Sequence, residues 1–320
     1  RIKNVANLIN DGEQKIVVLS AMSGTTNTLV EIADYLRKRN PESASAVINH
    51  LRTTYFQHIE KLFSNKDMLN ATAQILDDIF MHLHSFAGAT FNEDAEKSIL
   101  AQGELMSTNM MTNYLKEMGV NVCLLPALDY MKIDENGEPD TAYINQHLRE
   151  ILDQHKGYDI YITQGFICRN VNGGIDNLRR GGSDYTACLI GSALRANEIQ
   201  IWTDIDGMHN NDPRFVEKTA PVHELAFEEA AELAYFGAKI LHPTCIQPAK
   251  FAGVPVRLLN TMDPEAPGTT INNEFQHGKI KAVAAKEDIV CIQIQSSRML
   301  LAHGFLRKVF EIFESYKTSI

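Results

Sequence analysis

The segment LRRGGSDYTA, residues 178–187, concentrates residue types that could bind an anion. The arginine pair, Arg179 and Arg180, can offer planar guanidinium groups to a carboxylate. The glycine pair that follows leaves the backbone bare, so that a ligand can approach it closely. Ser183 or Asp184 is expected to start a helix, whose first N–H groups favour negative charge. Asp184 could hold a magnesium ion or orient a lysine. The alternative for the segment is a surface turn with an N-cap.

A second candidate loop, SAMSGTTN at residues 20–27, joins an apolar run to a predicted helix. Ligands of open α/β sheets bind at the carboxyl ends of the strands, so this loop could carry part of a site. It is not a Walker A loop, because it lacks the Gly-Lys-Ser/Thr sequence. The alternative is a strand-to-helix turn chosen for capping.

Three further segments carry polar side chains that could act on a ligand. AQGELMST, residues 101–108, places Glu104 and Ser107 near a helix start, where a capping carboxylate is the simpler interpretation. WTDIDGMHNNDPR, residues 202–214, follows a strand and could bind ribose, purine or phosphates, or form a polar surface loop. In FGAKILHP, Lys239 could reach a polyphosphate or point into solvent, and His242 is expected to be structural.

Apolar runs that alternate with amphipathic helices predict an α/β fold with a largely parallel sheet. The predicted strands are 15–21, 121–127, 158–166, 198–204 and 255–260, with a hairpin turn at 172–174. The predicted helices are 2–9, 28–39, 95–116, 143–154, 185–196 and 222–236, and residues 41–88 form a helical excursion.

The character of the chain changes near Gly278. Residues 278–295 are predicted to form strands and residues 304–316 a helix. Because so few elements cannot bury their own apolar faces, we expect a second small module that is cut short. The predicted domains are residues 1–281 and 282–320. The chain opens inside a helix, so we also expect that a first strand and glycine loop are missing.

Composition excludes several classes of protein. The chain of 320 residues has a net charge of -10 and no basic run, which argues against nucleic acid and anionic membranes. Its five cysteines form no Cys-x-x-Cys pair, so we expect buried free thiols in a reducing cytoplasm and no zinc site. No apolar stretch reaches about 18 residues, so no membrane span is expected.

The order of these motifs resembles the aspartate kinases of the amino-acid kinase family. The set is SAxSGxTN, GELMS, TQGFI, RGGSDYTA, WTDIDGM with DPR, FGAKxLHP and PGTxI, and it runs from about Val17 to Gly268. The tail SSRMLLAHGFLRKVFEIFESY is similar to the first ACT regulatory module of lysine-sensitive aspartate kinases. The resemblance implies a three-layer αβα amino-acid kinase fold, followed by the start of a small α+β ACT-like module.

The resemblance also implies an activity: transfer of the γ-phosphoryl group of ATP, with Mg²⁺, to the side-chain carboxylate of L-aspartate. The product, 4-phospho-L-aspartate, is the first intermediate toward lysine, threonine and methionine. Arg180 would hold the substrate α-carboxylate, and Glu104 would accept its α-ammonium group. Asp184 would organise the active site as a catalytic carboxylate. The pocket would be lined by Ser20, Thr26 and Ser183.

The nucleotide and the regulator would bind elsewhere. ATP would be held by Thr203, Asp204, His209, Arg214 and the catalytic Lys239, and His209 stands where the family often has Tyr. Feedback inhibition by lysine would use Met299, Gly304, Phe305 and Leu306, in paired ACT modules of a homodimer or larger homo-oligomer. The alternative for the tail is a simple dimerisation element.

Two other functions stay open at this point. A glutamate or acetylglutamate kinase would share the fold, although FGAKILHP and GELMS speak against it. A catalytically weak ACT-linked amino-acid sensor would also fit, because the family opens with a Lys-Phe-Gly-Gly loop that precedes the residues present here. Residues 1–320 alone are therefore expected to have little kinase activity.

Overall fold

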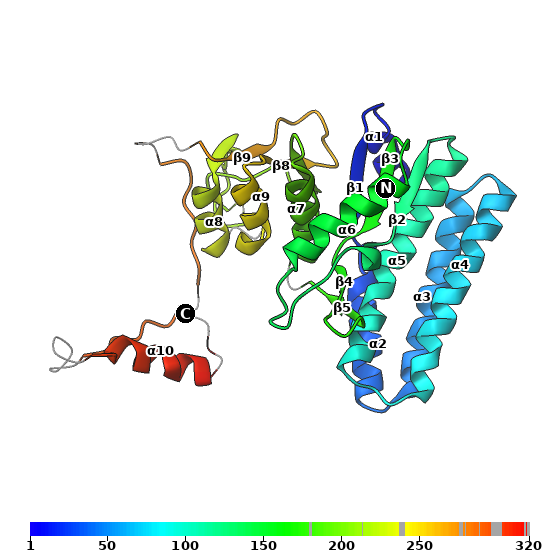
Figure 1. Cartoon of the computed structure of the whole chain (residues 1–320), viewed down its shortest axis with the longest axis horizontal. Helices are drawn as coiled ribbons and strands as arrows, with labels where there is room; N and C mark the ends of the chain where they lie inside the picture. The colour runs from blue at the N-terminus through cyan, green and yellow to red at the C-terminus, as the bar shows by residue number, and fades with distance from the viewer. Residues whose placement is uncertain are drawn as a thin grey trace. The chain divides into compact units, whose positions relative to one another are not determined.

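The computed structural model describes residues 1–178, 181–212, 214–236, 241–274, 278, 280–287, 289–295, 303–316 and 318. The chain divides into two compact units, Arg1–Ala284 and Ala285–Ile320. Among the described residues, no helix combines the length and the apolar character needed to cross a membrane. Figure 1 shows the elements of the first unit in chain order from blue to orange.

A three-stranded parallel sheet occupies the first half of the chain. Its strands are β1 (Lys15–Leu19), β2 (Val122–Leu125) and β3 (Ile160–Gln164), in the order β1-β3-β2. The central strand β3 is buried along its length, as expected for a continuous apolar strand between two parallel neighbours. Leu19 pairs with Gln164, so the loops that leave β1 and β3 begin side by side.

A four-stranded sheet follows in the second half of the same unit. Its strands are β6 (Ile199–Thr203), β7 (Glu224–Ala226), β8 (Val256–Asn260) and β9 (Thr269–Asn272), in the order β6-β8-β9-β7. β6 with β8 and β7 with β9 are parallel, whereas β8 and β9 are antiparallel. The predicted turn at residues 172–174 is confirmed by the hairpin of β4 (Ile167–Arg169) and β5 (Ile175–Asn177).

Helix α7 (Gly182–Leu194) joins the two sheets. It contacts β1 of the first sheet and β6 of the second, and it lies between them in Figure 1. Other helical segments of this unit are α1 (Ile2–Ile9), α6 (Thr141–Gln154), α8 (Phe227–Tyr235), α9 (Gln247–Ala252), η1 (Phe86–Gly88), η2 (Ala127–Asp129) and η3 (Pro243–Ile246).

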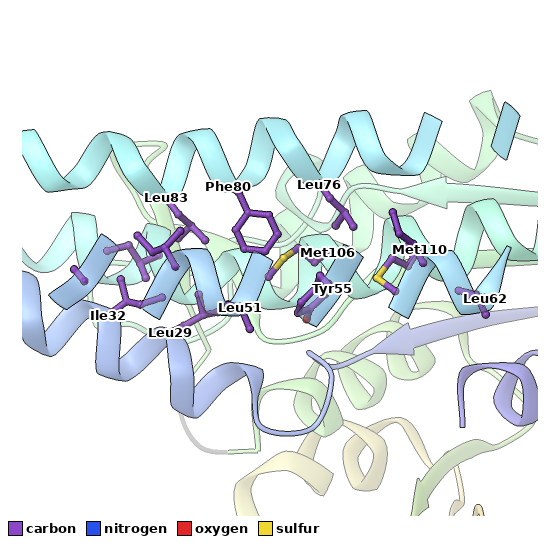
Figure 2. Close-up of a cluster of buried hydrophobic side chains, with 14 of the residues drawn as sticks. Leu29, Ile32, Leu51, Tyr55, Leu62, Leu76, Phe80, Leu83, Met106 and Met110 are labelled. Atoms are coloured by element: carbon purple, nitrogen blue, oxygen red, sulfur yellow. The ribbon is translucent and has the colours of Figure 1, made fainter. Parts of the chain in front are cut away.

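The predicted helical excursion is confirmed as a helical pair beside the first sheet. It consists of α3 (Pro41–Leu62) and α4 (Lys66–Ser85), which pack with α2 (Thr25–Arg37) and α5 (Glu93–Glu117). Asparagine side chains at positions 40 and 65 accept hydrogen bonds from the first-turn amides, which starts each helix of the pair. The four helices share one apolar core, drawn in Figure 2.

Two of the predicted elements are wrong. Residues 222–236 were expected to form one helix, but 224–226 form β7 and α8 starts at Phe227. Pairing with β9 extends the sheet there, and the Glu229 carboxylate accepts from the Ala226 amide, which starts the helix later. The strands expected within 278–295 are not formed by its described residues, since only the Val283 amide there bonds to a distant backbone group.

The second unit contains α10 (Phe305–Ser315), which confirms the helix expected near the end of the chain. Its side chains Leu306, Phe310 and Ile312 are exposed within the structure. The assignment of this unit as an ACT-like module stays a prediction. The described cysteines are free thiols; four are buried as expected, but Cys291 is exposed.

Candidate active site

The loop that follows β1 is hydrogen-bonded to the middle of α5. The Ala21 amide donates to the Glu104 carboxylate over 3.1 Å, and the Ser107 hydroxyl donates to the Ser20 carbonyl over 2.8 Å. The two backbones approach so closely at Gly103 that an added Cβ would lie 2.7 Å from the Cβ of Ala21. Glycine at position 103 therefore allows Glu104 to reach the loop.

The sequence suggested that Glu104 lies near a helix start, and this prediction is wrong. Glu104 lies far from either end of α5, so capping cannot explain it. Its side chain is only 4% exposed, and burial raises its pKa to about 7, although the Ala21 amide partly offsets this. None of the ion pairs among the described residues includes Glu104. A buried acceptor of this kind can hold a cationic group such as a ligand ammonium.

The loop that follows β3 packs onto the start of α7. The Gly165 amide donates to the Leu19 carbonyl over 3.0 Å, which joins this loop to the end of β1. An added Cβ at Gly165 would lie 2.4 Å from the Ser183 Oγ and 2.8 Å from its Cα. Ser183 is thereby brought to the same edge of the sheet as Ser20.

Phe166 has an unusual backbone for a non-glycine residue, with φ of 68°. This left-handed conformation costs roughly 1–2 kcal/mol, and such strain concentrates at functional sites. It is held by two bonds: the Phe166 amide donates to the Thr186 hydroxyl over 3.1 Å, and its carbonyl accepts from the Leu178 amide. TQGFI belongs to the motifs of the predicted resemblance, but no site residue was predicted within it. A glycine–aromatic pair directly after a buried strand was the available signal.

Asp184 lies in the first turn of α7, behind a left-handed Gly181 with φ of 72°. The side chain is half-buried, and burial raises its pKa to about 6. Within the described part of the chain, no hydrogen bond or ion pair to this carboxylate is found. Asp184 is thus a second carboxylate able to accept a cation, on the element that links the two sheets.

The predicted nucleotide residues that the structure describes lie at or after the carboxyl end of β6 on the second sheet. Thr203 ends the strand, and Asp204 is exposed directly after it. Both ring nitrogens of His209 are engaged by protein groups, at 2.8 Å from Asp206 and 2.7 Å from Thr219. This leaves only the face of the imidazole ring for a nucleotide.

Arg214 follows in the same loop and is exposed. Its Nε lies 3.0 Å from both carboxylate oxygens of Asp212, so a phosphate would have to compete with this pair. Four other predicted positions, Arg179, Arg180, Lys239 and Met299, lie outside the described residues. Gly304 is the N-cap of α10, and Phe305 and Leu306 form its first turn.

The sequence is similar to a known family of kinases over most of its length. Residues 1–260 match the model of the amino acid kinase family. Over 317 residues the chain is 33% identical to the lysine-sensitive aspartokinase 3 of Escherichia coli, covering 98% of this chain and 70% of that protein. The chain belongs to the aspartokinases of the amino acid kinase family. The predicted resemblance and the α/β fold are therefore confirmed.

Solved aspartokinases have the same architecture. The crystal structure of E. coli aspartokinase III with aspartate and ADP superimposes with a TM-score of 0.82 at 32% identity, covering 100% of this chain and 72% of that one. Aspartokinase 1 of Arabidopsis thaliana, a chloroplastic protein, is 32% identical over 100% of this chain. The chain spans only 58% of that relative's length.

Proposed function

We propose that this aspartokinase chain phosphorylates the side-chain carboxylate of L-aspartate with ATP, giving 4-phospho-L-aspartate. The observation that carries the proposal is the pair of carboxylates with raised pKa values, the buried Glu104 on α5 and the half-buried Asp184 on α7. These two helices pack against the loops that leave β1 and β3. The similar E. coli enzyme has been solved with aspartate and ADP, which supports the same substrates here. The product would enter lysine, threonine and methionine biosynthesis in the cytoplasm.

Glu104 would bind the α-ammonium group of aspartate. Its carboxylate is buried, and the Ala21 amide holds one of its oxygens, so the group is oriented before the ligand arrives. Arg180 would hold the α-carboxylate as a planar fork. The hydroxyl side chains of Ser20, Thr26 and Ser183 would line the remaining surface. Gly165 supports this placement of the two serines, because its amide bonds to Leu19, directly before Ser20, and its Cα packs against Ser183.

In the reaction, one oxygen of the substrate β-carboxylate would attack the γ-phosphorus of ATP. The bond to the β–γ bridging oxygen breaks, and ADP leaves with that electron pair. An aspartate side chain has a pKa of about 3.9, so the nucleophile is already ionised and no general base is needed. The barrier is the approach of two anions, so positioning and charge neutralisation must supply the catalysis. The first-turn amides of α7 would contribute to this charge neutralisation.

Asp184 would organise the cations that accompany the phosphates. Among the described residues, no group of three or more metal-ligating side chains is found. Magnesium in kinases is commonly held by one or two carboxylates and by substrate phosphates, so Asp184 fits as its protein ligand. The ion would neutralise charge on the phosphates, and Asp184 or Lys239 would fix where that charge lies.

ATP would bind beyond the end of β6, at Thr203, Asp204, His209 and Arg214, and Lys239 would hold it as well. Thr203 is anchored there, because its carbonyl accepts from the Thr261 amide over 2.8 Å. Helix α7 contacts both β6 and β1, which supports the proposal that it links the nucleotide to the aspartate site.

The second unit would regulate this activity. E. coli aspartokinase III has also been solved with lysine and aspartate, with a TM-score of 0.74 at 32% identity. We propose a lysine site at Met299, Gly304, Phe305 and Leu306, completed by the same module of another subunit in a homo-oligomer. Equilibrium dialysis of lysine against the full-length protein tests this, and no saturable binding at millimolar lysine would exclude it.

The reaction itself is tested by trapping the acyl phosphate with hydroxylamine. The full-length protein is incubated with MgATP and L-aspartate, L-glutamate or N-acetylglutamate. Selective formation of aspartyl hydroxamate is the expected result. Trapping with glutamate instead would assign another amino-acid kinase, and no trapped product with retained lysine binding would favour a sensor.

Replacing Gly165 by alanine is expected to lower kcat/KM for aspartate by about 10²-fold. The added Cβ would lie 2.8 Å from the Cα of Ser183, and a backbone contact cannot be relieved by side-chain rotation. The start of α7 must shift, and a displacement near 1 Å costs roughly that factor in rate. Steady-state kinetics on the Gly88→Ala variant provide the control, because nothing lies within 4 Å of a Cβ at Gly88.

A further inference from the structure

Tyr55 places a phenol hydroxyl inside an otherwise apolar helical core. It lies on α3 and is 1% exposed, among side chains that include Leu29, Leu51 and Met106 (Figure 2). Its ring meets Phe80 edge-on, with centroids 6.1 Å apart, so a phenylalanine would fill the same space. The hydroxyl is therefore the feature of Tyr55 that needs an explanation, since burying it costs free energy unless it is hydrogen-bonded.

The partner of that hydroxyl is Thr25, at the first position of α2. The two oxygens lie 2.8 Å apart, and Thr25 is itself only 3% exposed. Thr25 closes the loop that follows β1, because its amide donates to the Met22 carbonyl over 2.9 Å. Burial, together with the Glu104 charge, raises the pKa of Tyr55 to about 12, so the phenol stays protonated. The same Glu104 accepts the Ala21 amide of this loop.

We propose that Tyr55 is a positioning residue for the aspartate site, which holds the loop of residues 20–24 against Glu104 through its hydrogen bond to Thr25, the first residue of α2. The inference rests on the proposed function, because it assigns that loop to aspartate. It also gives the α3–α4 pair a role. These helices lie between α2 and α5 in the sequence. Tyr55 extends from α3 to Thr25, where the loop that carries Ser20 enters α2.

The test compares Tyr55→Phe with wild type in the full-length protein. Loss of one hydrogen bond is expected to raise the KM for aspartate about 3- to 10-fold, with kcat and the KM for ATP little changed. Amide exchange in peptides covering residues 17–28 should become faster, while exchange in β2 and β3 stays as in wild type. Thr25→Val should raise the KM for aspartate and speed amide exchange as Tyr55→Phe does, whereas Thr25→Ser, which keeps the hydroxyl, should retain wild-type values. The double variant Tyr55→Phe with Thr25→Val should show a KM for aspartate no higher than that of either single variant.

Tyr114→Phe is the matched control. Tyr114 packs against the same core and contacts Phe63 edge-on, but its hydroxyl has no hydrogen bond to any described residue. It should leave loop exchange and the KM for aspartate unchanged. Unchanged loop exchange in Tyr55→Phe would overturn the inference, whatever the substrate is. Equal rises in the KM for aspartate and for ATP would also overturn it. Failure of the proposed function would appear differently, as absence of aspartyl phosphate in wild type.

Discussion

Replacing Glu104 by glutamine is expected to weaken aspartate binding by a factor of about 10² to 10³. The amide can still accept the Ala21 hydrogen bond, but it carries no charge to pair with the buried α-ammonium group. Binding of aspartate to the full-length protein is measured by isothermal titration calorimetry in the absence of ATP. Glu96→Gln is the control, because Glu96 lies on the same helix and pairs with Arg37 near the surface. Normal aspartate affinity in Glu104→Gln would exclude an ammonium site there.

The same substitution is expected to stabilise the ligand-free protein at pH 8. Burial raises the folded-state pKa of Glu104 from an ordinary 4.5 to about 7. Because the folded protein binds this proton more tightly than the unfolded chain, protonated Glu104 contributes on the order of 3 kcal/mol to the free energy of unfolding. This contribution is complete below pH 4.5 and is lost as pH rises through about 7. The wild-type affinity for aspartate should fall about tenfold per pH unit below 7, whereas that of the variant should not. Denaturant unfolding at pH 4 and pH 8 checks the stability.

Replacing Asp184 by asparagine is expected to lower kcat by about 10² to 10³, with a smaller effect on the KM for aspartate. The proposed task of Asp184 is to fix the cations on the transferred phosphate, and that matters most in the transition state. Steady-state kinetics with hydroxylamine trapping measure both constants. Asp153→Asn provides the control, since Asp153 pairs with Lys156 on the surface. A variant with unchanged kcat would remove Asp184 from the catalytic group.

Asp184→Asn should also be more stable than wild type at neutral pH. Burial raises the pKa of Asp184 from 3.8 to about 6, so the protein loses stability as pH rises through this range. The difference between variant and wild type should vanish below pH 3.8. Glu104 and Asp184 thus both lower stability at the pH where the enzyme is proposed to work. This is the usual cost of an active site prepared for a charged ligand.

The spacing of apolar residues in the sequence predicted most of the strands and helices, because these depend mainly on residues close together in the chain. The strand at 15–21 and the helix at 95–116 are confirmed within a few residues, because apolar periodicity reports which face is buried. β7 was missed because its strand character comes from pairing with β9, not from its own residues. Motif order, not any single motif, led to the aspartokinase family.

Contacts between distant segments could not be predicted in the same way. Glu104 looked like a capping group, because nothing in GELMS shows that Gly103 lets the helix touch Ala21. The hydrogen bond between Tyr55 and Thr25 depends on how α3 packs against α2, which the spacing of apolar residues does not fix. The left-handed Phe166 is likewise a product of two long-range bonds.

The end of β6 carries a built-in optical reporter. Trp202 is the single tryptophan of the chain, and it directly precedes Thr203 at the proposed nucleotide loop. Its indole nitrogen donates to the Gln200 side chain over 3.1 Å, which holds the ring in one orientation. All tryptophan emission of these 320 residues therefore comes from one place. Adding MgATP should shift or quench that emission without any label, whereas aspartate alone should leave it unchanged. Fluorescence titration would then count nucleotide sites directly, and a flat titration would place the nucleotide elsewhere.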